Sequence, residues 1–137
     1  MNVSKAKQTS ESIELGVLLA ISGGMMDAYS YMARGKVFAN AQTGNMLLFG
    51  VYLSQGEFAK AMHYFCPIIA FTIGIAMADL VRMKGNKKLH WRQLSVLLEA
   101  IILFAVGFIP MNMNLLANSL TSLACGIQVE SFRKIHG

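Results

Sequence analysis

Five apolar stretches alternate with short polar or basic segments along this chain of 137 residues. The stretches cover residues 13–32, 46–53, 62–81, 94–109 and 115–129. A helix needs roughly 20 mostly apolar residues to cross the hydrocarbon core of a membrane, and most of the stretches approach or reach that length. The pattern therefore predicts an all-α protein, a polytopic transmembrane helical bundle of about five membrane helices.

The second stretch differs from the others, because only its residues 46–53 are continuously apolar. The segment before it, Val37–Asn45, is mildly polar and contains Gly44, a residue that weakens helices. We expect the second membrane helix to be short or broken. The sequence leaves open whether this helix crosses the membrane or re-enters it from one side.

Charged residues make up only 14% of the chain, whereas soluble domains average about 25%. The net charge is +5, but Lys and Arg gather in short segments between the apolar stretches, where membrane proteins keep them for orientation. They do not form a basic face with interleaved aromatic residues, so nucleic acid is excluded as a partner. Membrane lipids are the expected partners of a multi-pass protein of the inner (plasma) membrane.

The basic segment Arg82–Arg92 is predicted to be cytoplasmic, because short loops rich in Lys and Arg stay inside. The side of the N-terminus depends on the second stretch. It is outside if that stretch crosses the membrane and inside if it re-enters. The charge rule fits both arrangements equally, because Lys5 and Lys7 exchange sides with Arg34 and Lys36.

Asp27 is the first candidate for function, since an ionisable group inside a membrane helix is costly and must face protein or water. It belongs to a narrow stripe with helical spacing, made of Gly16, Ala20, Gly23, Asp27, Ser30 and Arg34. Asp27 is either a proton or substrate site at a seam between helices, or a structural carboxyl group bonded to a neighbouring helix. Arg34 lies roughly 10 Å further along the helix, so we expect Asp27 to pair across helices or take up a proton.

The segment Val37–Asn45 is the second candidate. Its neutral hydrogen-bonding side chains are Asn40, Gln42, Thr43 and Asn45. Transporters use interrupted helices of this kind to expose backbone dipoles to a ligand. The alternative is a polar loop followed by a short helix. Glu99 is the third candidate for a substrate or ion pathway, and it lies within about 8 Å of Leu94, near enough to reach the membrane interface instead.

Small residues at helical spacing let membrane helices approach closely. We assign such a packing role to Gly16, Gly23, Gly24, Gly74 and Gly126.

The sequence contains no phosphate-binding glycine loop, nucleophile elbow or HExxH motif. His63 and His90 have no Cys or carboxylate at the spacing of metal ligands, and Cys66 and Cys125 are expected to be buried free thiols. We therefore expect no catalytic residues, no metal and no cofactor, and predict that the protein is not an enzyme.

Three segments, Gly23–Tyr29, Arg34–Asn45 and Cys125–Gln128, resemble the YoaK-like family of bacterial membrane proteins, a domain of unknown function. The resemblance implies an inner-membrane protein of about six or seven helices, without an established substrate. It also implies a second Thr-Gly-Asn segment after a helix like the fifth one. We therefore expect the chain to be truncated after its fifth hydrophobic helix.

A weak internal sequence repeat relates Gly24 to Gly126 and Gly35 to Gly137. On this basis we expect residues 1–137 to form a single transmembrane domain, the N-terminal part of a longer duplicated architecture. The first functional hypothesis is a small secondary transporter or permease for a small molecule or an ion. The second is a non-transporting membrane protein with a structural, assembly or partner-binding role. Association into a homo-oligomer is compatible with both.

Overall fold

The computed structural model describes residues 12–84 and 91–133. It contains five α-helices, and the described residues form no β-strand, which confirms the predicted all-α class. The helices are α1 (Ile13–Ala33), α2 (Gln42–Ser54), α3 (Phe58–Lys84), α4 (Trp91–Gly107) and α5 (Asn114–Phe132), with a 3-10 turn, η2 (Met111–Met113), before α5. Lys5, Lys7, His90, Gly137 and residues 85–90 of the basic segment lie outside the described residues.

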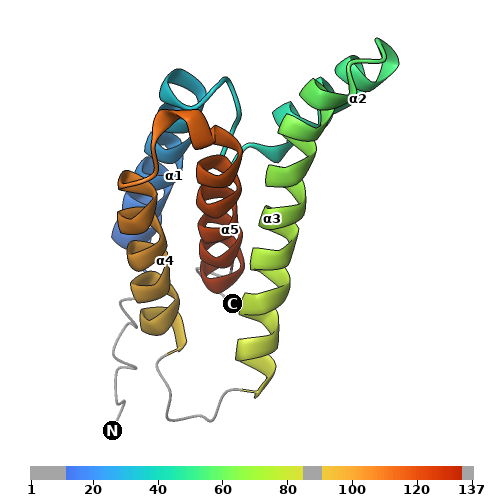
Figure 1. Ribbon diagram of the computed structural model, residues 1–137. Coiled ribbons are helices and arrows are strands. Elements are labelled where there is room, and N and C mark those ends of the chain that lie inside the picture. The colour runs from blue at the N-terminus through green and yellow to red at the C-terminus, as the bar shows by residue number, and fades with distance from the viewer. Residues whose placement is uncertain (1–11, 85–90, 134–137) are drawn as a thin grey trace, which may run out of the picture.

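Helix α5 is the centre of the bundle. Figure 1 shows α3 on one side of it and α1 and α4 on the other. Most of α5 is buried, and residues 124–128 are buried without interruption. Helices α3 and α5 run in the same direction, because α4 returns the chain between them.

Two glycines allow α3 and α5 to touch through their backbones. A Cβ atom at Gly74 would lie 2.3 Å from the carbonyl oxygen of Leu123, and one at Gly126 would lie 2.2 Å from that of Phe71. Both distances are shorter than any real carbon–oxygen contact, so only glycine fits at this crossing. Gly24, which the sequence analysis also assigned to packing, is exposed, and a Cβ atom there would meet no atom within 4 Å.

The bundle has polar side chains inside and apolar side chains outside. Its buried polar residues include Asn45, Glu99 and Asn118. Large apolar side chains such as Leu18 and Phe104 are 64% and 72% exposed. A soluble protein rarely leaves so much apolar surface in contact with water, whereas lipid tails accept it. Among the described residues, α3 is the one helix that is both long and apolar enough to cross a membrane.

Helix α2 does not run along the bundle. Together with the first turns of α3 it extends away from the other helices at one end (Figure 1). The ring nitrogen Nε2 of His63, near the start of α3, is 3.1 Å from the carbonyl oxygen of Gly35, just after α1. The chain between these two residues thus leaves and returns at the same end. With 13 residues, α2 is roughly 20 Å long, and it is the short second helix that the sequence predicts.

Candidate functional site

A row of polar side chains runs along the buried helix α5. It consists of Asn118, Ser122, Cys125 and Gln128, and all four are buried. Their spacing of three or four residues places them along one side of the helix. Each of them contacts a different part of the protein, so this polar row joins α5 to its neighbours.

The polar row begins beside the end of α1, where the Asn118 amide donates a hydrogen bond of 2.7 Å to the carbonyl oxygen of Arg34. Further along, the Gln42 amide of α2 lies 3.5 Å from the Ser122 hydroxyl oxygen. The Cys125 sulfur lies 3.5 Å from the Met26 sulfur of α1. Polar or polarisable atoms thus line the interior from one end of the bundle towards the other.

Glu99 meets the far end of the polar row. Its carboxylate Oε1 accepts a hydrogen bond of 2.8 Å from the Gln128 amide, and both side chains are buried. None of the ion pairs among the described residues includes Glu99. Burial of an acid between two helices of a membrane protein makes it a candidate functional group.

Asp27 binds the backbone just before the first turn of α2. Its Oδ1 accepts hydrogen bonds from the backbone N–H groups of Asn40, at 2.6 Å, and Ala41, at 3.3 Å. Ala41 is the N-cap residue of α2, so the carboxylate lies at the positive end of the helix, where negative charge is favoured. The partners of the Asp27 carboxylate therefore lie outside α1, in the segment before α2. Arg34 is not among them and has other partners.

The segment Val37–Asn45 is a loop followed by the first turn of α2. Asn45 clamps the loop: its Oδ1 accepts a hydrogen bond of 3.0 Å from the Phe38 N–H, and its Nδ2 donates one of 2.7 Å to the Phe38 carbonyl. Gln42 adds a bond of 2.7 Å from Nε2 to the carbonyl of Ala39. These side chains satisfy the backbone of a loop that turns back into the bundle towards Asp27.

The remaining predicted residues of this segment have other roles. Thr43 is exposed. The Asn40 side chain lies over Gly23, where a Cβ atom would be 2.9 Å from its Nδ2. Gly44 leaves room for the ring of Phe38 in the same way, at 2.8 Å. Gly16, at the start of the stripe, is half-buried.

Arg34 is buried, and its role could not be predicted from its place in the sequence. Its guanidinium donates hydrogen bonds to the carbonyl oxygens of Val106 (3.3 Å), Ile109 (2.8 Å) and Pro110 (3.1 Å), and to the Tyr29 hydroxyl (2.6 Å). A cation is favoured at the negative C-terminal end of a helix, so Arg34 caps α4. A cavity of about 670 Å³ between α1 and the end of α4 opens beside it.

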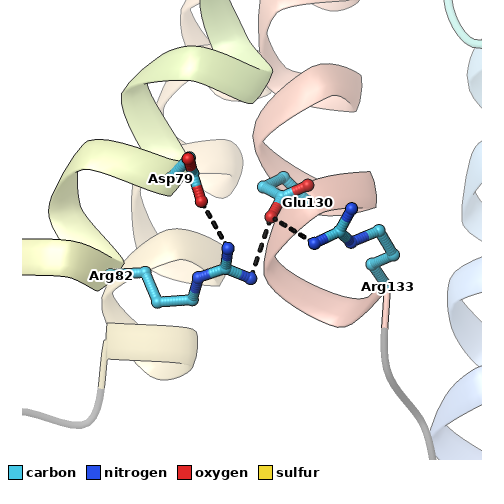
Figure 2. A network of polar contacts seen from close by, with 4 residues as sticks. All are labelled: Asp79, Arg82, Glu130 and Arg133. Carbon is cyan, nitrogen blue, oxygen red and sulfur yellow. Dashed lines mark hydrogen bonds and ion pairs between the residues drawn. The ribbon is translucent and has the colours of Figure 1, made fainter.

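Charged residues join α3 and α5 at the opposite end (Figure 2). Asp79 and Arg82, like Glu130 and Arg133, have the three-residue spacing of an ordinary pair within a single helix. The structure has both pairs and adds a bond between helices, 2.9 Å from Nη1 of Arg82 to Oε1 of Glu130. Glu130 is buried although its two arginine partners are more exposed.

The sequence does carry a signal for the polar row. Asn118, Ser122, Cys125 and Gln128 repeat at helical spacing, although Ser119 and Thr121 add polar positions between them. Such a repeat marks one face of a helix. The partners of these residues are far away in the chain and could not be read from it. No group of three metal-ligating side chains occurs among residues 12–84 and 91–133.

Comparisons with known proteins support the assignment of this chain as a membrane protein. Residues 15–137 match the family described as "Protein of unknown function (DUF1275)". The chain is 27% identical over 128 residues to the UPF0700 transmembrane protein YoaK of Bacillus subtilis (strain 168). The match covers 86% of this chain and 55% of YoaK, so the chain spans about half the length of that relative. No solved structure matches the chain.

Proposed function

This chain belongs to the family of proteins of unknown function DUF1275, and from that premise we propose that it is a multi-pass inner-membrane protein that acts as a small secondary transporter or permease. Membrane localisation follows from the family, since its relative YoaK is a transmembrane protein. The multi-pass topology, the assignment to the inner membrane and the transport activity are what we propose.

In the proposed topology α1, α4 and α5 cross the membrane together with α3, which alone among the described helices qualifies by length and composition. Helix α2 turns back on the outer side. Helices α1, α3, α4 and α5 have 21, 27, 17 and 19 residues. At 1.5 Å per residue even the shortest is roughly 26 Å long, close to a hydrocarbon core of about 30 Å. With the basic segment Arg82–Arg92 in the cytoplasm, an α2 that does not cross places the N-terminus in the cytoplasm as well.

The polar row of α5, together with Glu99, carries the proposal of transport. Intramembrane acids mark pathways for ions and substrates and serve as proton relays, and the neutral side chains of the polar row continue from Glu99 along α5. Asp27 adds a second acid beside the buried start of the short helix α2, and transporters build substrate sites at such helix ends.

The test is uptake of a panel of small molecules and ions into vesicles that contain the protein, with and without an imposed proton gradient. The proposal expects gradient-dependent uptake of at least one compound, and loss of the gradient dependence in Glu99→Gln. Protein-free vesicles and vesicles with the Ala28→Leu protein, altered on the exposed side of α1, are the controls. Uptake equal in all vesicles across the panel contradicts transport.

A non-transporting structural or partner-binding protein is the second candidate. It is supported by the bonds of Asp27, Gln42 and Asn45, because these side chains hold the loop before α2 and are already occupied. On this alternative the polar interior only fastens helices together. Glu99→Gln would then leave every measured flux unchanged, while affinity purification would recover a stable membrane partner or a homo-oligomer.

A further inference from the structure

A basic cavity of about 410 Å³ lies at the end of the bundle where α2 and α3 begin to diverge from α1. Its walls come from three segments: the Gly35–Lys36 turn after α1, Tyr52 of α2, and the first two turns of α3. Neither the polar row nor the charge network of Figure 2 contributes to it. The cavity is thus separate from the site described above.

Three of the side chains that line this basic cavity, Lys36, Lys60 and His63, are basic. Lys60 forms an ion pair with Glu57, which does not line the cavity. None of the ion pairs in residues 12–84 and 91–133 includes Lys36, whose ammonium lies 4.9 Å from the centre of the Tyr31 ring. The walls therefore carry an excess of positive charge.

The backbone that presents Lys36 is unusual. Gly35 has φ +92° and Lys36 has φ +66°, a left-handed conformation that few residues other than glycine adopt. His63 holds the turn, because the Gly35 carbonyl can only accept a hydrogen bond and the ring nitrogen Nε2, at 3.1 Å, donates it. Backbone strain of this kind gathers at ligand sites, where the surrounding structure enforces it.

Two tyrosines complete the wall. The rings of Tyr52 and Tyr64 stack with their centres 5.7 Å apart, and the Lys60 ammonium lies 5.4 Å from the centre of the Tyr52 ring. A phenol hydroxyl is a hydrogen-bond donor, and tyrosine is enriched at the level of lipid headgroups. The cavity thus combines positive charge with aromatic walls where a helix bundle meets the membrane surface.

We infer that this basic cavity binds the phosphate group of an anionic ligand. Lysine binds phosphate as a point charge, and the second lysine, from a different segment, would hold another oxygen of the same group, while His63 keeps the turn that presents Lys36 in place. The phosphate comes either from the headgroup of a lipid or from a free phosphate in solution. The inference stands whether or not the protein transports a substrate.

The test titrates the purified full chain in detergent with inorganic phosphate and, separately, with short-chain phosphatidic acid, and follows the melting temperature. Diacylglycerol with the same acyl chains is the control that lacks phosphate. Stabilisation by inorganic phosphate identifies a site for a free anion. Stabilisation by phosphatidic acid alone identifies a lipid headgroup site, and both results support the inference.

Lys36→Asn is the decisive variant, because asparagine tolerates the left-handed conformation and so preserves the turn while removing the charge. We expect phosphate affinity to fall roughly tenfold, as for the loss of one charged partner. Lys60→Gln should weaken binding in the same direction. The matched control Lys84→Asn removes one charge at the other end of α3 and should leave affinity unchanged. Equal affinity in Lys36→Asn and Lys84→Asn, or no phosphate-dependent stabilisation of the unaltered protein, overturns the inference.

Discussion

The Gln128 amide of α5 donates a hydrogen bond to the Glu99 carboxylate of α4 across 2.8 Å, and both side chains are buried. Glu99→Gln preserves an oxygen that can accept this bond while it removes the ionisable proton. We expect Glu99→Gln to express and melt like the unaltered protein and to abolish proton-linked uptake in vesicles. Full retention of gradient-driven uptake would remove Glu99 from the proposed pathway.

Gln128→Leu removes the partner of Glu99 and leaves a buried carboxyl group without its donor. A buried polar group that loses its partner costs about 1–3 kcal/mol, so the free energy of unfolding in detergent should fall by that amount. Val129→Leu, at an exposed neighbouring position, is the control and should change little. Equal stability of the two variants would show that the Glu99–Gln128 bond contributes nothing.

Asp27 anchors the loop before α2 through the N–H groups of Asn40 and Ala41. Asp27→Asn retains an accepting oxygen and should retain the fold. Asp27→Leu leaves two N–H groups unpaired and should lower the free energy of unfolding by roughly 1–3 kcal/mol. The measurement is thermal unfolding in detergent, with Ala28→Leu as the control on the exposed side of the same helix. If Asp27→Leu melts like this control, the hydrogen bonds of Asp27 do not stabilise the fold.

The crossing of α3 and α5 should not tolerate a single methyl group. Gly74→Ala and Gly126→Ala each place a Cβ atom on a backbone oxygen of the other helix, and overpacking typically costs 1–3 kcal/mol. Gly24→Ala is the matched control, because its Cβ would meet no neighbour and alanine favours a helix by about 1 kcal/mol. The expected order of melting temperatures therefore places Gly24→Ala at or above the unaltered protein and both crossing variants below it.

Orientation is testable with an impermeant thiol reagent in intact cells, in a protein whose Cys66 and Cys125 are replaced by alanine. A cysteine at Gln55, in the turn between α2 and α3, should react. A cysteine at Asn86, in the basic segment, should react only after the membrane is opened. Ready labelling of the Asn86 cysteine in intact cells contradicts the proposed topology.

The bond between Arg82 and Glu130 joins α3 to α5 at the basic end of the bundle (Figure 2). A double-mutant cycle of Arg82→Gln and Glu130→Gln should give a coupling free energy of roughly 1 kcal/mol, since Arg82 is partly exposed. The coupling should shrink as salt is raised, because ions screen exposed charges. A coupling near zero at low salt would mean that the Arg82–Glu130 bond does not help to hold the two helices together.

The hydrophobic pattern determined the helices and their surroundings. Long apolar stretches with few charges specify membrane helices whatever their neighbours are, because backbone polar groups in lipid must bond within the helix. The short second helix followed from the same local pattern, whereas α3 (Phe58–Lys84) extends beyond both ends of its apolar stretch, residues 62–81. The glycines at positions 74 and 126 were readable for the same reason, since small residues at helical spacing mark a face for close packing.

The tertiary structure alone decided which polar groups meet. The positions of Gln128 and Glu99, or of Arg34 and the end of α4, are far apart in the chain, and their contacts depend on how the helices rotate and pack. The same packing brings Gly35 and His63 together at one end of the bundle, so the chain between them leaves and returns there. The local sequence determines where a helix forms, because its backbone hydrogen bonds lie within the helix. The partner of each polar side chain depends on how the surrounding helices pack against it.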